Sequence, residues 1–178
     1  DIVLTKGIAI EATSIMAREF ADKLEVKFGS RFVNRCKNFI NNPGIVVLKD
    51  SQIAARYGKI HAMHDPTEGG LGAGLHELAI ASKTGILIER DMIPVLTECR
   101  KLCDYFGIDP LGAIASGSLL ISVSSRDSKK VVSGLKKNGI NASIIGKVVD
   151  KKRGIKIREN GKLKNLRIFA RDEITKVF

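Results

Sequence analysis

The residues best suited to chemistry stand together at 61–73, which read His-Ala-Met-His-Asp-Pro-Thr-Glu-Gly-Gly-Leu-Gly-Ala. This stretch follows an apolar segment at 59–63 and leads into apolar residues spaced as in a helix. It therefore predicts a strand–loop–helix junction. Junctions of this kind often bind phosphate, because the backbone N–H groups at the start of the helix can hold an anion. Phosphate handling is the first chemistry that these residues suggest.

A purely structural role explains part of the same stretch. Asp65 would cap the helix, Pro66 would open it and Glu68 would complete a capping box. The glycines at 69, 70, 72 and 74 do not fit this role, since each costs a helix interior about 1 kcal/mol relative to alanine. Two reasons for them are kept open: close packing of a neighbouring element, or approach of an anion to the main chain.

We select two groups of candidate residues. The catalytic candidates are Asp65, which could orient phosphate or a metal-bound nucleotide, and Lys6, which follows the first strand and could neutralise transferred charge. Each has a structural alternative, a helix cap for Asp65 and a solvated side chain for Lys6. The candidates for binding nucleotide or phosphate are His64, Thr67, Gly69, Gly70 and Glu11.

Composition and charge fit one domain of ordinary size, with 178 residues of which 44% are hydrophobic. Residues 126–178 carry 16 Lys and Arg against 5 Asp and Glu, so the whole net charge of +11 lies in the last third. This basic flank could attract nucleic acid. Without an aromatic platform, a solvated lysine-rich surface is favoured over nucleic-acid binding. No apolar run is long enough for a membrane span and no signal pattern is present, so we expect a cytoplasmic protein.

The cysteines and histidines form no metal-binding pattern. Cys99 and Cys103 are four residues apart on an apolar helix face, which predicts buried thiols in a reducing compartment. His61 and His64 are three apart at a strand end, which predicts side chains on opposite faces. We therefore expect no metal site in this chain.

Apolar spacing indicates an α+β fold in one domain. Strands are expected at 1–5, 59–63, 86–89, 118–123 and 142–149, and a basic hairpin turns at 159–162. Helices are expected at 8–24, 30–40, from 71 to 84, at 94–107, at 127–138 and at 171–178. Residues 43–57 stay open, because 45–48 have strand propensity while 54–58 resemble the end of a helix. The long first crossover and the closing hairpin predict a mixed sheet.

Three stretches resemble one known domain, namely residues 1–13, residues 61–79, and residues 109–121 with 138–148. In this order they are similar to the second domain of the aminoimidazole ribonucleotide (AIR) synthetase superfamily. The loop at 64–70 resembles that of the hydrogenase-maturation (HypE) branch more than those of the thiamine-monophosphate kinase or ribonucleotide synthetase branches. The resemblance implies an α/β/α three-layer, partly ferredoxin-like fold over residues 1–178, with a helix within 43–57.

The resemblance also implies partners and cofactors. In this superfamily a preceding N-terminal domain binds most of the ATP and Mg²⁺ and forms a homodimer, and a maturation partner protein is expected. This chain would then be the second domain of a longer protein. We expect the isolated domain to fold without hydrolysing ATP.

The implied function is ATP-dependent activation of an amide or related oxygen by phosphoryl transfer, as in carbamoyl dehydration for hydrogenase maturation. HypE-type enzymes carry the carbamoyl group on a C-terminal cysteine, whereas this chain ends Thr-Lys-Val-Phe and its last cysteine is Cys103. Glu68 stands where those enzymes commonly have Arg. The alternative is a non-catalytic binding or regulatory module that uses the basic flank for nucleic acid or a protein partner.

Overall fold

A single mixed sheet runs through the computed structural model, which describes all residues from 1 to 178. Its strands are β1 (Ile2–Thr5), β2 (Ile60–His64), β3 (Gly85–Glu89), β4 (Leu120–Val123), β5 (Ala142–Val149), β6 (Ile155–Glu159) and β7 (Lys162–Asn165). They lie in the order β2-β4-β1-β5-β3-β6-β7. Every neighbouring pair is antiparallel except β3 and β6. The expected mixed α+β fold is confirmed.

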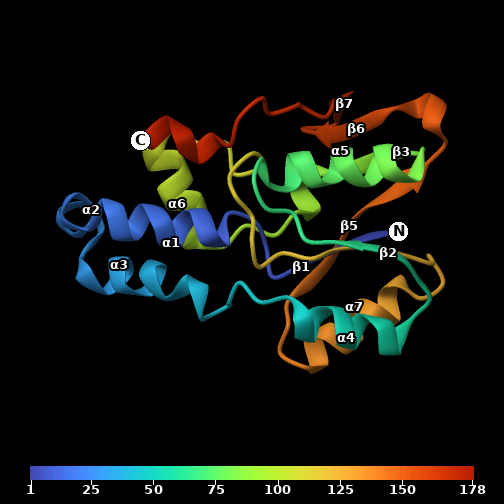
Figure 1. Ribbon diagram of the computed structural model, residues 1–178, viewed down its shortest axis with the longest axis horizontal. Coiled ribbons are helices and arrows are strands. Elements are labelled where there is room, and N and C mark those ends of the chain that lie inside the picture. Colours follow the sequence, from blue (N-terminus) through green and yellow to red (C-terminus); the bar gives the residue numbers. More distant parts are fainter.

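Helices cover both faces of this sheet. They are α1 (Ile10–Glu19), α2 (Ala21–Phe28), α3 (Ser30–Lys37), α4 (Leu48–Tyr57), α5 (Gly70–Ser82), α6 (Thr97–Phe106) and α7 (Ser128–Lys137). Short 3-10 turns lie at η1 (Asn38–Ile40), η2 (Arg90–Met92), η3 (Lys151–Arg153) and η4 (Glu173–Val177). Figure 1 shows α5 on one side of the strands, α4 and α7 on the other, and α1, α2, α3 and α6 grouped at one end.

The alternation of side chains along β1 shows how these layers form. Ile2 and Leu4 pack with α5, whereas Val3 between them packs with α4 and α7. Successive residues of a strand point to opposite faces, so an unbroken apolar strand buries both faces of the sheet. A third apolar cluster joins α1, α3 and α6.

Several expected element boundaries were wrong. The single helix expected at 8–24 is two helices, α1 and α2, which separate at Phe20. The Phe20 ring lies 5.0 Å from that of Phe106 and 5.7 Å from that of Phe178, so tertiary packing fixes the bend. The second helix ends at Lys37 and continues as η1, α4 begins only at Leu48, and α6 begins at Thr97 rather than at Pro94. The closing helix is the 3-10 turn η4.

Candidate functional site

The expected junction joins β2 to α5, but its helix starts later than the capping pattern suggested. Strand β2 ends at His64 and α5 begins at Gly70. Gly69 is the N-cap, with a left-handed backbone (φ 74°) and no side-chain cap. The expectation that Asp65 caps the helix was therefore wrong. Asp65 is exposed and lies in the irregular stretch between the strand and the helix.

Three amides at the start of α5 are paired within the chain. The Gly69 N–H donates to Oδ2 of Asp172 over 2.8 Å, and the Gly70 N–H donates to the Thr67 carbonyl over 3.0 Å. The Gly72 N–H donates to the Leu111 carbonyl over 2.8 Å. A phosphate approaching Gly69 would therefore have to displace a carboxylate that already occupies the positive end of the helix.

Close packing is sufficient reason for the glycines inside α5. A Cβ at Gly70, where φ is 63°, would lie 2.5 Å from the Ala113 carbonyl oxygen. A Cβ at Gly72 would lie 2.7 Å from the ring of Phe169. Backbone and ring therefore approach α5 too closely for any side chain at these positions. Of the two reasons kept open for these glycines, the structure shows close packing of neighbouring elements.

Lys6 is buried rather than solvated, and its ammonium group is fully engaged. Nζ lies 2.7 Å from the carbonyl oxygen of Val46 and 3.3 Å from that of Gly44. It also lies 3.3 Å from Oδ2 of Asp50. An ammonium group has three hydrogens, so these three acceptors leave none free for a transferred phosphate. In this arrangement Lys6 fixes the segment that leads into α4, which corrects both the expectation of a solvated lysine and that of a free cation.

Asp50 is a residue that sequence reasoning missed. Its side chain is 1% exposed, and Oδ1 has no hydrogen-bond partner. An acidic residue in the first turn of a helix is ordinarily solvated and stabilises the helix through its interaction with the helix dipole. Only its long-range pairing with Lys6 distinguishes it, and no local pattern in the sequence reports that pairing.

Four charged or titratable side chains, together with burial, influence the pKa of Asp65. Partial burial of the carboxyl group raises the pKa of Asp65 above its usual value. His64 and Lys6 oppose that rise through their positive charge, while Asp50 and Glu11 add to it. The structure therefore brings the candidates Asp65, Lys6, His64 and Glu11 into one electrostatic neighbourhood.

Two further candidates flank this neighbourhood. Nε2 of His64 lies 2.7 Å from Oε2 of Glu77, which holds the imidazole against α5. Thr67 is exposed, and its carbonyl accepts from the N–H groups of Gly70 and Ala115. The backbone of the loop is thus fixed, while the side chain of Thr67 faces solvent.

The C-terminal tail supplies two more residues that sequence reasoning missed. The Asp172 carboxylate accepts from the backbone N–H groups of Gly69, Ile114 and Ile174. Glu173 is 4% exposed and accepts from the N–H of Asp109 over 3.1 Å. The tail therefore joins the glycine-rich start of α5 to the loop before β4.

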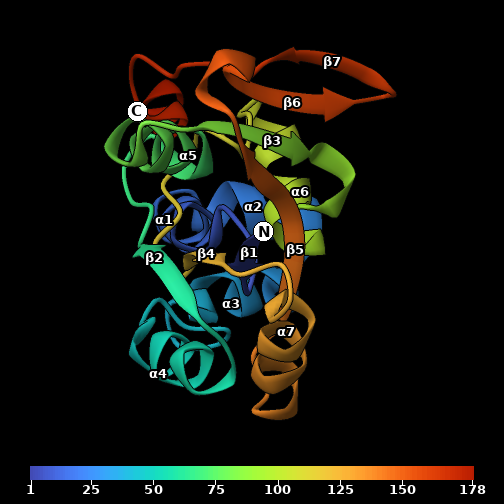
Figure 2. The same ribbon diagram turned by 90° about the vertical axis from the view of Figure 1, so that its right-hand side faces the viewer.

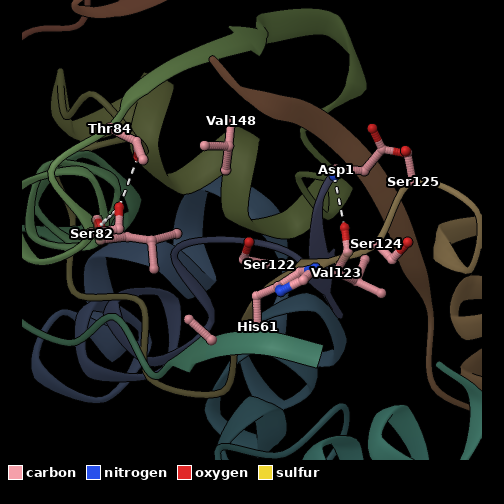
Figure 3. Close-up of a pocket in the computed structure, with 11 residues that line it drawn as sticks. Asp1, His61, Ser82, Thr84, Ser122, Val123, Ser124, Ser125 and Val148 are labelled. Carbon is pink, nitrogen blue, oxygen red and sulfur yellow. Dashed lines mark hydrogen bonds between the residues drawn. The ribbon is translucent and has the colours of Figure 1, made fainter. Parts of the chain in front are cut away.

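The cavity drawn in Figure 3 lies elsewhere, beside the start of β2. It has a volume of about 480 Å³, and none of the candidate site residues lines it. His61, Ser122, Thr84 and Val148 surround it (Figure 3). His61 shares this cavity with residues of α5, and His64 also contacts α5. The expectation of opposite faces was wrong, because the register of β2 shifts between Ile60 and Ala62.

The three cysteines of the chain lie in its interior. Cys36, Cys99 and Cys103 are all buried, and burial raises the pKa of each thiol to about 12. The two cysteines of α6 are therefore core residues, as their spacing predicted. No three His, Cys, Asp or Glu side chains are grouped so that they could hold a metal ion.

Comparison with known proteins places this geometry in a family. The family model of the AIR synthase related protein, C-terminal domain, matches residues 1–158. The chain belongs to this family. The resemblance seen in the sequence is thereby confirmed, and the tail with strand β7 lies beyond the matched part of this AIR synthase-related domain. No helix in it is both long and apolar enough to cross a membrane.

Named relatives come from hydrogenase maturation. A putative hydrogenase expression/formation protein of Methanocaldococcus jannaschii is 38% identical over 99 residues, which cover 54% of this chain and 30% of that protein. Carbamoyl dehydratase HypE of Escherichia coli is 34% identical over 95 residues, which cover 52% of this chain and 28% of the relative. The aligned part is thus about a third of each relative.

Solved structures share the fold of the whole chain. The crystal structure of E. coli HypE superposes with a TM-score of 0.75 at 24% identity, covering all of this chain and 52% of that one. HypE in complex with ATP gives 0.69 at 20% identity, covering 97% and 51%. HypE from a HypE–HypF complex gives 0.63 at 24% identity, covering 96% and 52%. The chain spans about half the length of these structures.

Proposed function

We propose that this domain is the substrate side of a HypE-like enzyme that uses ATP to activate an amide or related oxygen, as in carbamoyl dehydration. The observation that carries the proposal is the exposed Asp65 in the β2–α5 loop of an AIR synthase-related domain. The hydrogenase-maturation relatives support the same reaction class.

The residues of this chain do not by themselves fit Mg-ATP. The Gly69 and Gly70 N–H groups have partners, the Lys6 ammonium is fully engaged, and no acidic cluster is placed for a metal ion. A Mg²⁺ site for phosphoryl transfer needs carboxylates beside the phosphates. We therefore assign nucleotide and Mg²⁺ mainly to a preceding domain of a longer protein. The twofold greater length of the solved neighbours, one of them an ATP complex, supports this assignment.

The role that we assign to this chain is to present and position the acceptor. Asp65 stands at the exposed mouth of the loop, and the raised pKa of its carboxyl group suits it to exchange a proton with the acceptor. Lys6 and Asp50 contribute indirectly, because their ion pair fixes the segment that leads into α4. His64, Thr67 and Glu11 complete the proposed binding surface, whereas Gly69 and Gly70 are buried and their N–H groups are paired.

The partners that we assign follow from the same likeness. One solved neighbour is HypE in complex with HypF, which supports a maturation partner protein for the complete protein. We further propose a homodimer formed through the preceding domain, in the cytoplasm. We do not assign the acceptor to any of the three cysteines of this chain, because all three are buried.

The test is ATP turnover by the complete protein that contains this domain, screened against carbamoylated peptides and small amides. Asp65→Asn should lower kcat/KM by about 100-fold or more, the range for loss of a proton-transferring group. Glu68→Gln, an exposed neighbour in the same loop, is the matched control and should change little. Magnesium-dependent turnover by residues 1–178 alone, or full activity of Asp65→Asn, would contradict the proposal. Salt-sensitive RNA binding without any nucleotide effect would favour the binding-module alternative.

A further inference from the structure

A groove of about 460 Å³ lies between α7 and β5, on the face of the sheet opposite α5. In Figure 2 the lower end of strand β5 meets helix α7, and the two elements contact each other. None of the candidate site residues lines this groove. It is therefore separate from the surface around Asp65.

Lysines form one wall of the groove. Lys129, Lys136 and Lys137 are seven and eight residues apart along α7, so they project from one face of the helix. None of the three forms a salt bridge within the chain, and no acidic side chain lines the groove. Lys130, which points elsewhere, pairs with Asp127 of its own helix. The groove therefore carries an uncompensated positive charge.

Apolar side chains form the rest of the groove. Val132 of α7 and Ile144 of β5 are half-buried, and Met92 of η2 is 52% exposed. A methionine side chain adapts to different apolar partners, which makes it frequent on surfaces that bind helices. An apolar centre with a cationic wall is complementary to a helix that has apolar residues on one face and acidic residues beside them.

We propose that this groove docks an acidic amphipathic helix of a partner protein. Apolar side chains of that helix pack between Met92, Val132 and Ile144, and its carboxylates meet the three lysines of α7. Nucleic acid fits less well, because the apolar centre offers no aromatic surface on which bases could stack. The inference does not depend on the proposed enzymatic function.

The experiment measures binding of a fluorescent synthetic peptide to the full chain by anisotropy. The probe is about 15 residues long, with leucines on one face and glutamates flanking them, as a groove-binding helix requires. A second probe replaces its glutamates by lysines. We expect the acidic peptide alone to bind, and either single substitution, Lys129→Glu or Lys136→Glu, to weaken it by about tenfold or more. Met92→Ser should also weaken it while leaving its salt dependence unchanged.

Lys130→Glu is the matched control, because it makes the same charge change on the same helix outside the groove. The proposal is overturned by absence of binding, by equal binding of the lysine peptide, or by equal weakening in Lys130→Glu. Binding of a duplex RNA at these lysines, insensitive to Met92→Ser and unaccompanied by peptide binding, would assign the groove to polyanions and overturn it as well. All substituted positions are exposed, and circular dichroism verifies that each variant is folded.

Discussion

Oδ2 of Asp172 lies 2.8 Å from the backbone nitrogen of Gly69, although the two residues are 103 positions apart in the sequence. The C-terminal tail thereby supplies an anion to the N-terminus of α5. A carboxylate at this position satisfies an amide that has no partner inside its own helix and interacts favourably with the helix dipole. An external phosphate can reach the same amide only by displacing Asp172.

Replacement of Asp172 by alanine should loosen this tail. The N–H groups of Gly69, Ile114 and Ile174 would lose their acceptor, and we expect the free energy of unfolding to fall by about 1–3 kcal/mol. Urea denaturation measures the change, and hydrogen exchange should accelerate at the Gly69 amide. Arg171→Ala, the exposed neighbour, is the control. Unchanged exchange at Gly69 would show that the tail does not protect the loop.

A comparison of Gly70→Ala with Gly107→Ala separates the cost of backbone strain from the cost of steric overlap. Gly70 and Gly107 have similar backbone angles, with φ of 63° and 67°, but a Cβ meets backbone atoms only at Gly70. Gly107→Ala should cost about 1–2 kcal/mol through its left-handed backbone alone. Gly70→Ala should cost about 1–3 kcal/mol more, as overpacking does. Equal losses of stability in the two variants would mean that the loop at 111–113 moves aside freely.

The buried pair of Lys6 and Asp50 should respond strongly to loss of one partner. Their side chains are 8% and 1% exposed, so each single substitution leaves a buried charge without its counterion. Lys6→Met or Asp50→Asn should each lower the free energy of unfolding by about 3–5 kcal/mol. The double variant Lys6→Met with Asp50→Asn should lose less than the sum of the two. Strict additivity in this double-mutant cycle would show that the pair is not coupled.

Glu173 should make the docking of the tail sensitive to acid. Burial would raise the pKa of Glu173, but Lys176, the Asp109 N–H and Arg167 outweigh it and hold that pKa below the usual 4.5. A lowered pKa means that the group adds stability above pH 4.5, and that this stability is lost as the pH falls through the folded-state pKa. Glu173→Gln should therefore destabilise the protein at pH 7, with the difference disappearing in acid. Thermal melts from pH 7 to pH 3 follow it, and a pH-independent difference would contradict the prediction.

Asp65 should show the opposite dependence. Partial burial raises its pKa above the usual 3.8, so the protonated form is favoured in the folded state. Its contribution to stability is present below pH 3.8 and is lost as the pH rises through the raised pKa. A carbon-detected NMR titration of the Asp65 carboxyl should give a midpoint above 3.8, and Asp65→Asn should gain slightly in stability near neutral pH. A midpoint at or below 3.8 would contradict this account.

Local patterns were sufficient to predict the family and most of the helices and strands. Apolar spacing located strand β5 and helix α7 within a residue or two, since that signal depends only on nearby residues. Asp50 and Asp172 were missed because their roles depend on partners far away in the sequence. In isolation each is an ordinary polar residue near a helix or turn, and nothing in its surroundings shows that it will be paired.

Strand β1 lies in the middle of the sheet, where Ile2 is opposite both Ser122 of β4 and Gly146 of β5. Both partners are synthesised more than a hundred residues later, so β1 leaves the ribosome with no strand to pair with. During translation its apolar side chains stay exposed until β4 and β5 emerge, a period in which a chaperone would compete with aggregation. Contacts so distant in sequence also slow formation of the sheet, because bringing together strands that are far apart in the chain costs entropy before their contacts form. Because of the order of synthesis, the central strand β1 remains without its partner strands for a longer part of translation than any other strand of the sheet.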